Sequence, residues 1–256
     1  MLRRTAVLSA LLALGWQTLA SAHFHMLFPE PPSAVAEKPV SFLFQFGHPF
    51  EHELFNTAAP EKLVMFAPDR QQTVLTESLQ KTTSKGADGK EVTGYRFTFT
   101  PPKRGDYTCV ATTAPIWMEH EKQFLQDSVK VVLHVQTQKN WDVATGGFEL
   151  TPLTRPYGLQ PGMVFQAQVL NDGKPQAGVQ AEVERYNPVA PKELPGDEQV
   201  TRRVKADPNG VLTCTLTDPG WWCLTAEQAG GEKKHDGKNF PLIRRTTFWV
   251  YVDAKP

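Results

Sequence analysis

The chain has 256 residues, in which 27 Lys and Arg balance 27 Asp and Glu, and 40% of its residues are hydrophobic. This charge balance, without a basic tail or stripe, argues against nucleic acid as a partner, and the length suffices for two domains of about 100 residues each. The 21 prolines, 15 phenylalanines and many short alternating runs favour an all-β protein over a helical one.

Residues 1–22 are predicted to form a signal peptide. The basic start MLRR is followed by the apolar run AVLSALLALGW and by ASA, which fits an A-x-A cleavage pattern. The apolar run is shorter than the roughly 20 residues that a membrane-spanning helix requires. We therefore expect cleavage after Ala22, export to the periplasm, and a mature protein whose first residue, His23, carries the α-amine.

The first half of the mature chain, residues 23–137, is predicted to form a β-sandwich of about seven strands. Its β-rich runs are separated by polar, turn-forming stretches such as Ser84 to Lys90. The expected strands lie at 40–46, 63–68, 94–101, 105–112 and 128–137.

Residues 138–150 are the expected crossover to a second all-β unit, residues 151–254. Two strands of this unit are predicted to pair around Asn171-Asp172-Gly173. The order of strands and tight turns is similar to that of small Greek-key domains of the transthyretin-like or carboxypeptidase-regulatory type. The other expected turns and the closing strand lie at 207–210, 218–220 and 246–252.

The three cysteines do not suggest a thiolate metal site, because none has CxxC spacing. Cys214 and Cys223 flank a predicted turn, so they could face each other across a hairpin and form a disulfide in an oxidising compartment. Two unpaired thiols are the alternative, because turns and bulges reset side-chain direction. Cys109 is expected to be buried beside its strand neighbours.

The first three mature residues, His-Phe-His, suggest a metal site at the chain end. The α-amine, two backbone amides and the His25 imidazole could close a planar four-nitrogen site, which suits Cu(II) and Ni(II). Alternatively, the amine and the ring of His23 chelate one ion and a distant histidine such as His48 completes a brace. Both modes use the same amine, so they exclude each other. A third reading is that these histidines lie by chance near a frayed terminus.

The sequence GHPFEHE follows a predicted strand and therefore forms a loop at a sheet end. Pro49 stiffens the loop, and His48, Glu51 and His52 are close enough in sequence for one or two of them to share a site. Imidazole and carboxylate together suit divalent transition metals. The alternative is a polar surface loop with one packed histidine.

The remaining histidines are weaker candidates. His120 lies in the polar segment MEHE, His134 within a predicted strand, and His235 beside the predicted turn residues Asp236 and Gly237. There is no G-x-S-x-G motif, P-loop or G-x-G-x-x-G motif in the sequence. We therefore expect a binding protein and not an enzyme.

In its motifs and their order, nearly the whole mature chain resembles the periplasmic accessory proteins of nickel/cobalt uptake. These NikK-like proteins are encoded beside energy-coupling-factor Ni/Co importers, and their domain was long catalogued as of unknown function. The matching segments are AHF at 22–24, HPFE at 48–51, PLTRPYGL at 152–159, KADPNGV at 205–211, PGWW at 219–222, KHDGK at 234–238 and FWV at 248–250.

The resemblance implies a two-domain β protein outside the inner membrane, with His23 and His48 as the functional histidines. A histidine at the third mature position is less regular in that family, which favours the brace over the planar site. We expect the protein to capture Ni(II) or Co(II), or Cu(II), through His23, His25, His48 and Glu51, and to deliver the ion to membrane subunits of such an importer.

Three alternatives remain open from the sequence. A copper-handling periplasmic chaperone is disfavoured because methionine-rich tracts are missing. A copper-dependent polysaccharide monooxygenase also uses an N-terminal histidine brace, but it needs a flat aromatic substrate face, which the scattered Tyr and Trp residues do not suggest. An adhesion-like protein without a metal would need only the two β units.

Overall fold

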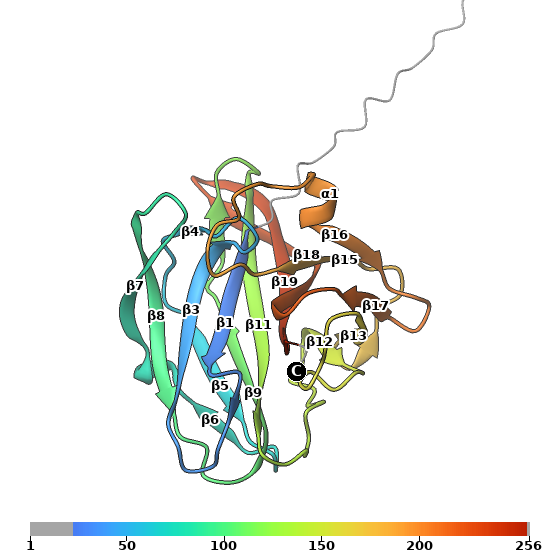
Figure 1. The fold of residues 1–256 in the computed structure, drawn as a ribbon. Helices are drawn as coiled ribbons and strands as arrows, with labels where there is room; N and C mark the ends of the chain where they lie inside the picture. The colour runs from blue at the N-terminus through green and yellow to red at the C-terminus, as the bar shows by residue number, and fades with distance from the viewer. Residues whose placement is uncertain (1–22, 255–256) are drawn as a thin grey trace, which may run out of the picture.

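The computed structural model describes residues 23–254, whose regular secondary structure is almost entirely β-strand (Figure 1). The predicted all-β sandwich is confirmed. The helical elements in this range are a 3₁₀ turn at Thr76–Ser78 and the short helix α1 (Asp197–Val200). The predicted signal peptide lies outside the described residues.

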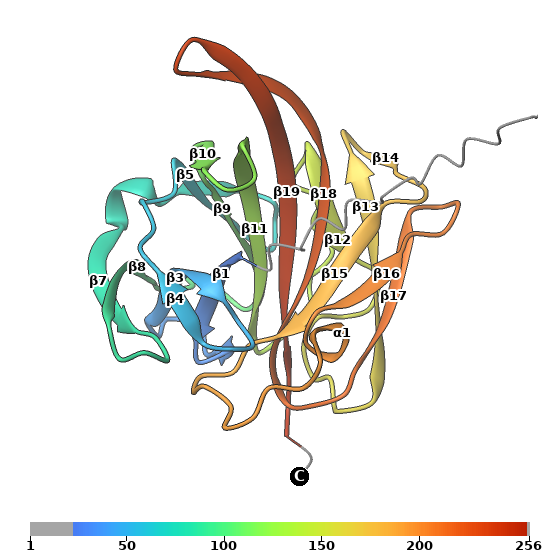
Figure 2. The same ribbon diagram turned by 90° about the horizontal axis from the view of Figure 1, so that it is seen from above.

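The strands form three sheets. The two smaller sheets lie on opposite sides of the largest one. Seen from above, β1, β3 and β8 lie on one side of β11 and β19, and β12, β13 and β17 lie on the other (Figure 2). Among residues 23–254 there is no helix with the length and apolar character needed to span a bilayer.

A five-stranded antiparallel sheet has the order β1-β3-β8-β7, with β4 paired to β3. Its strands are β1 (Phe24–Glu30), β3 (Val40–His48), β4 (Glu53–Phe55), β7 (Gln80–Lys85) and β8 (Glu91–Phe99).

A ten-stranded sheet has the order β16-β15-β18-β19-β11-β9-β5-β6, with β2 and β10 paired to β11. Its strands are β2 (Ser33–Ala34), β5 (Lys62–Phe66), β6 (Gln72–Val74), β9 (Gly105–Thr112), β10 (Ile116–Met118), β11 (Gln123–Val135), β15 (Gln180–Arg185), β16 (Arg202–Lys205), β18 (Gly220–His235) and β19 (Lys238–Val252). At its centre β11 and β19 run parallel, so strands far apart in the sequence become neighbours.

The third sheet has the order β12-β13-β14, with β17 paired to β13. Its strands are β12 (Phe148–Pro152), β13 (Met163–Asn171), β14 (Lys174–Pro175) and β17 (Val211–Leu216).

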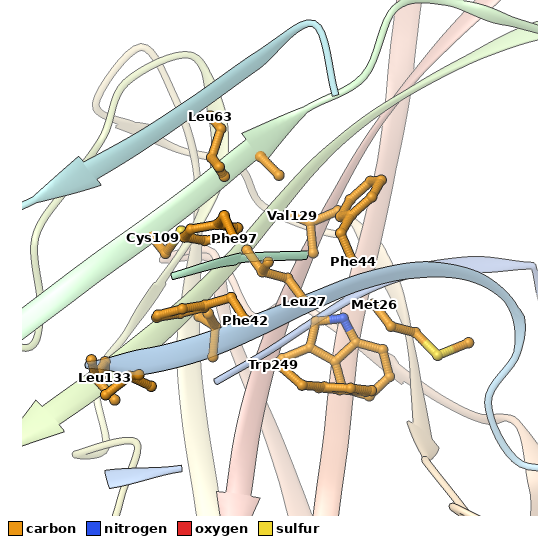
Figure 3. Packing of buried hydrophobic residues seen from close by; sticks show 14 of the residues in the cluster. Met26, Leu27, Phe42, Phe44, Leu63, Phe97, Cys109, Val129, Leu133 and Trp249 are labelled. Atoms are coloured by element: carbon orange, nitrogen blue, oxygen red, sulfur yellow. The ribbon is translucent and has the colours of Figure 1, made fainter. Parts of the chain in front are cut away.

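Two hydrophobic clusters fill the spaces between the sheets. The first lies between the five-stranded sheet and the ten-stranded sheet and contains Phe42, Phe44 and the fully buried Trp249 (Figure 3). The second lies between the ten-stranded and the four-stranded sheets and contains Phe165 and Phe248. Large aromatic side chains contribute much of the apolar area that stabilises both clusters.

The strands predicted for the first half are confirmed as β3, β5, β8, β9 and β11. Most residues of the first cluster come from this half, but it also includes Cys223 and Trp249. The ten-stranded sheet is continuous across the predicted crossover at 138–150, because β11 pairs with β19. The domain boundary at 138–150 therefore stays a prediction.

The predicted pairing of two strands around Asn171-Asp172-Gly173 is confirmed, but over two residue pairs only. The turn connects β13 only to the two-residue β14, and the chain then crosses to the ten-stranded sheet, where β15 pairs with β16 and β18. Pro175 provides a physical reason, because it has no N–H to donate to a longer ladder. The turn residues specified a tight turn correctly but not the length of the strand after it.

Cys109, Cys214 and Cys223 are all unpaired and buried, so the disulfide alternative is wrong. The turn at 218–220 carries the chain from β17 in the four-stranded sheet to β18 in the ten-stranded sheet. The two thiols therefore lie in different hydrophobic clusters. Burial raises the pKa of the Cys214 thiol to about 11, which keeps it protonated and unreactive near neutral pH.

Gly47 permits the close pairing of β4 with β3. A Cβ at this position would lie 2.0 Å from the carbonyl oxygen of Glu53. We expect Gly47→Ala to lower the free energy of unfolding by roughly 1–3 kcal/mol, because the β4 backbone must move away. Urea denaturation measures this, with Gln80→Ala on the exposed β7 as the control; an unchanged midpoint for Gly47→Ala would contradict the expected clash.

Candidate metal centre

The pairing of β1 with β3 brings His23 and His48 together. Phe24 is opposite Gly47 and His25 is opposite Phe46, so His23, one residue before the strand, comes opposite His48. Directly opposite residues of an antiparallel pair project on the same face of the sheet. The two imidazole rings meet edge to face, with their centres 4.2 Å apart.

Aromatic side chains surround this histidine pair. The His23 ring centre lies 5.9 Å from that of Phe46 and 5.2 Å from that of Phe55, which is 5.6 Å from His48. Burial lowers the pKa of His23 to about 4, and the nearby charges of His48 and Arg245 add to the effect. The His23 ring is therefore neutral at neutral pH, which is the form that ligates metals.

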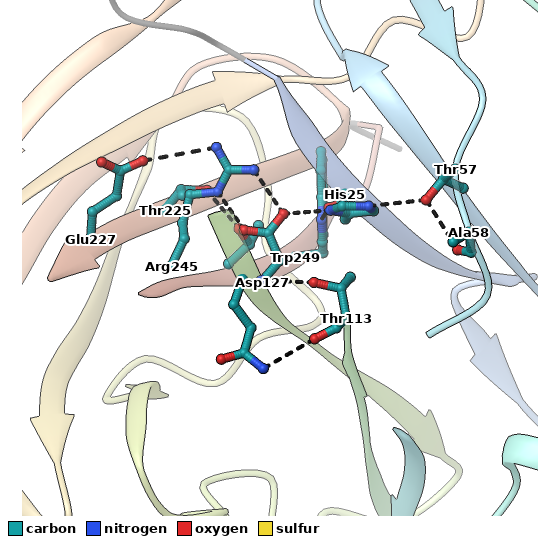
Figure 4. Close-up of polar contacts among 11 residues, drawn as sticks. His25, Thr57, Ala58, Thr113, Asp127, Thr225, Glu227, Arg245 and Trp249 are labelled. Carbon is teal, nitrogen blue, oxygen red and sulfur yellow. Dashed lines mark hydrogen bonds and ion pairs between the residues drawn. The ribbon is translucent and has the colours of Figure 1, made fainter. Parts of the chain in front are cut away.

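His25 is fully buried and faces a different set of partners (Figure 4). Its Nδ1 is hydrogen-bonded to the carboxylate of Asp127, and its Nε2 lies 3.1 Å from Oγ1 of Thr57. The indole Nε1 of Trp249 donates to the backbone oxygen of His25 at 3.0 Å. Both ring nitrogens are thus occupied, and the contacts hold β1 against the central sheet.

Asp127 connects His25 to a buried arginine. In the parallel pair β11–β19, Asp127 is opposite Arg245, whose Nε and Nη2 each donate to the Asp127 carboxylate at 2.7 Å. Burial alone would raise the pKa of Asp127, but the Arg245 charge and the His25 contact outweigh it and hold it at about 2. The carboxylate is therefore ionised across the physiological pH range.

The loop that carries His48 is attached to the end of β15. The backbone N–H of Phe50 donates to Oε1 of Glu184 at 3.1 Å, and Asn187 binds the carbonyl oxygens of Pro49 and Phe50. Burial raises the pKa of Glu184 to about 8, although the bonds from Thr201 and Phe50 favour its ionised form. Residues from the second half of the chain thus fix the position of His48.

Glu184 is expected to make stability depend on pH. Its pKa is raised from 4.5 to about 8 in the folded protein, so its contribution is complete below about pH 4.5 and is lost as pH rises through 8. We expect Glu184→Gln to match the wild type near pH 5 and to be more stable at pH 8, by on the order of 3 kcal/mol. Urea denaturation at several pH values measures this. Parallel pH profiles for the two proteins would contradict the assignment.

The other polar residues of GHPFEHE have different surroundings and do not join the histidine pair. Glu51 has one buried carboxylate oxygen without a hydrogen-bond partner, and its charge acts on Glu184. Nε2 of His52 lies 3.0 Å from the backbone oxygen of Lys85, so this ring contacts β7. Glu53 lies opposite His48 in the β3–β4 pairing. The structure therefore adds Glu53 to Glu51 as an acidic neighbour of this loop.

The remaining histidines have no part in the pair. His120 is exposed, His134 is hydrogen-bonded to Asp106, and His235 stacks on Trp117 at the predicted β18–β19 turn. The predicted turn beside His235 is confirmed, because β18 ends at His235 and β19 begins at Lys238. MEHE does contribute Glu121, whose charge raises the pKa of His23 slightly against the larger lowering effects.

Sequence reasoning did not find Thr57, Asp127 and Arg245. The one available signal was the position of Asp127 in the predominantly buried strand QFLQDSVKVVLHV. A buried carboxylate requires a partner of opposite charge or a hydrogen-bond donor. Nothing in the sequence identified Arg245 as that partner.

Within residues 23–254, no group of three or more His, Cys, Asp and Glu side chains gathers closely enough to hold a metal ion. The side chains of the centre therefore supply two imidazoles, and a further ligand has to come from the main chain, from a rearranged carboxylate or from solvent. Two imidazoles whose ring centres lie 4.2 Å apart have the ligand chemistry of a transition-metal site.

A protein-family model described as a domain of unknown function, DUF4198, matches residues 20–230. No curated protein sequence matches the chain. Among solved structures, a DUF4785 family protein from Legionella pneumophila is 11% identical, with a TM-score of 0.31 over 82% of this chain and 53% of that one. The chain thus spans about half the length of the Legionella protein.

Two further solved structures are similar over most of this chain. The Salmonella alpha-2-macroglobulin reacted with methylamine is 14% identical over 91% of this chain and 15% of that one, with a TM-score of 0.28. The adhesin InvE of Yersinia pseudotuberculosis is 14% identical over 88% of this chain and 58% of that one, with a TM-score of 0.23. Similarity at this level carries no argument about function.

Proposed function

Because the chain belongs to the DUF4198 family of domains of unknown function, we propose a function from its site: the exported protein captures Ni(II) or Co(II) and delivers the ion to a membrane importer. The observation that carries this proposal is the pair of imidazole rings, His23 and His48, whose centres lie 4.2 Å apart. Cleavage after Ala22 would add an α-amine on the residue that already provides one of the two rings.

The ligand set of the proposed site is the α-amine and ring of His23 and the ring of His48. With metal–nitrogen bonds of about 2.0–2.1 Å, two imidazoles at right angles around one ion have centres on the order of 4.5 Å apart. The separation of 4.2 Å requires little movement to reach that value. An all-nitrogen set suits Ni(II), Co(II) and Cu(II) better than Mg(II) or Ca(II).

In this proposal His25 anchors β1 and is not a ligand. The planar four-nitrogen mode would need the His25 ring to leave both Asp127 and Thr57. It would also need the backbone amides of Phe24 and His25, which lie in the paired region of β1 and β3, to bind the metal. Both costs favour the brace mode.

Glu51 is the proposed source of a further oxygen ligand or of a hydrogen bond to a ligand, because one of its buried oxygens has no partner. Glu53, opposite His48 in the β3–β4 pairing, is the alternative carboxylate for this role. Separate Glu51→Gln and Glu53→Gln variants, compared by calorimetry, distinguish the two. If only Glu53→Gln lowers the affinity for the metal ion, Glu53 and not Glu51 has the proposed role.

The terminal amine is tested by titrating Ni(II), Co(II) and Cu(II) separately into two versions of the protein. One begins at His23 and the other retains Ala22, which moves the amine one residue away while leaving every side chain of the site in place. We expect one ion per chain and an affinity at least about 100-fold lower in the extended version, because a chelating amine is lost. Equal affinity in both versions would rule out the proposed site.

Copper handling is the second candidate function, because nitrogen ligands bind Cu(II) more tightly than Ni(II) or Co(II). The metal that accompanies the protein when it is purified from the periplasm of its own cells distinguishes the two. Nickel or cobalt would support uptake of those ions, and copper would support the second candidate.

A further inference from the structure

A second candidate site lies at the opposite end of β11, where the two halves of the chain meet. It is a cavity of about 330 Å³ lined by residues of β11, of the segment 155–158 and of the ends of β18 and β19. Such a volume lies within the range of small-molecule sites, which is about 300–1,000 Å³. His134 in its wall is seven residues beyond Asp127, or roughly 23 Å along the strand, so the cavity is separate from the histidine pair.

Aromatic rings form much of the cavity wall. Tyr157 stacks on His134 with ring centres 4.0 Å apart, and Trp221 meets Tyr251 edge to face at 5.1 Å. All four side chains are partly exposed and line the cavity. Rings in this arrangement can hold a flat apolar group by stacking.

A buried carboxylate fixes the orientation of His134. Asp106 is fully buried and accepts hydrogen bonds from Nδ1 of His134 at 2.7 Å and from the hydroxyl of Tyr157 at 3.0 Å. The other ring nitrogen of His134, Nε2, has no hydrogen bond to any residue between 23 and 254. A polar group is thus held rigidly in the wall with one atom left for a ligand.

Arg155 supplies the positive charge of the cavity. Its Nε donates to the backbone oxygen of Tyr157 at 3.1 Å, and its guanidinium lies 5.2 Å from the centre of the Tyr157 ring. The two terminal nitrogens make no hydrogen bond within the described part of the chain. A guanidinium fixed through Nε, with its terminal nitrogens unpaired, matches the two oxygens of a carboxylate.

We propose that this cavity binds a small organic carboxylate with a flat apolar body. Arg155 pairs with the carboxylate, the apolar body lies among Tyr157, Trp221 and Tyr251, and Nε2 of His134 makes a second polar contact. Asp253 also lines the cavity and opposes the binding of an anion, so its removal strengthens binding. The site requires no metal at the histidine pair and is independent of the function proposed above.

The test uses 3-phenylpropionate as the probe and its neutral amide, 3-phenylpropionamide, as the matched control. Both are titrated into the metal-free mature protein and followed by calorimetry and tryptophan fluorescence. We expect saturable binding of the acid and at least about tenfold weaker binding of the amide, because only the acid pairs with Arg155. Equal binding of the two, or no saturable binding of the acid up to about 10 mM, would overturn the proposal.

Variants locate the site. Arg155→Gln should weaken binding of the acid at least about tenfold, while Arg203→Gln on the edge strand β16 should leave it unchanged. Asp253→Asn should strengthen binding a few-fold, and Trp221→Phe should remove the fluorescence change but keep most of the affinity. Arg155, Arg203 and Asp253 are exposed, and Trp221, which is partly buried, is replaced by another aromatic side chain. Circular dichroism of each variant checks that the fold is retained. Wild-type binding in Arg155→Gln would contradict the proposed role of the cavity.

Discussion

Replacing His48 with alanine is expected to lower the affinity of the mature protein for Ni(II) and Co(II) at least about 100-fold. The brace depends on His48 for the one nitrogen ligand that does not come from the first residue. Without it, the amine and ring of His23 are the only nitrogen ligands left. Calorimetry on protein that begins at His23 measures the change.

The control for this variant is His120→Ala, which removes the same side chain from an exposed position. It should bind metal as the wild type does. His48 is partly buried against Phe55, so circular dichroism and a thermal melt must show that His48→Ala remains folded. A folded His48→Ala protein with wild-type affinity would contradict the brace and support the planar mode through His25.

The strands of the first half were predictable because their side chains obey a simple local rule. In β3 and β11, runs of alternating or β-branched residues end at clear turn residues. Each strand of the structure coincides with such a run. β1 was not predicted as a strand. Six of its seven residues are buried, so FHMLFPE shows no alternation of polar and apolar residues, and a short run without such a pattern does not indicate its partner strand.

The pairing of the second half was predicted only in part, since turn residues specify a turn but not the sheet that follows it. The Asp218-Pro219-Gly220 turn is present, yet the strands on its two sides belong to different sheets. For the same reason the sequence allows a Cys214–Cys223 disulfide that the structure does not contain: the chain changes sheets at this turn instead of forming a hairpin.

The sequence indicates which residues are candidate ligands of the site, but it does not indicate which residues contact one another. His23 and His48 are notable in the sequence, but their proximity follows from the register of β1 on β3, which any one-residue slip would destroy. Asp127 and Arg245 are 118 residues apart and meet through a parallel strand pair. No local pattern encodes such a pairing, so the network beneath the site became visible only in three dimensions.

Asp127→Asn is expected to lower the free energy of unfolding by about 3–5 kcal/mol, because it leaves the buried guanidinium of Arg245 without its carboxylate. The change keeps the shape of the side chain and removes only the charge that both Arg245 and His25 contact. Urea denaturation measures the loss. Asp88→Asn, which breaks an exposed pair with Lys90, is the matched control and should show no measurable change.

Stability and positioning can be separated by replacing both charged partners. A buried ion pair can often be exchanged for apolar residues of similar volume without loss of stability, so Asp127→Leu combined with Arg245→Met should recover much of what Asp127→Asn loses. The double variant still leaves Nδ1 of His25 without an acceptor. If the double variant recovers its stability but binds metal more weakly than the wild type, the buried pair serves to hold His25, and with it the start of β1, in register beneath His23. If it recovers its stability and binds metal as the wild type does, the pair contributes only to folding, and the position of His23 depends on the β1–β3 ladder alone.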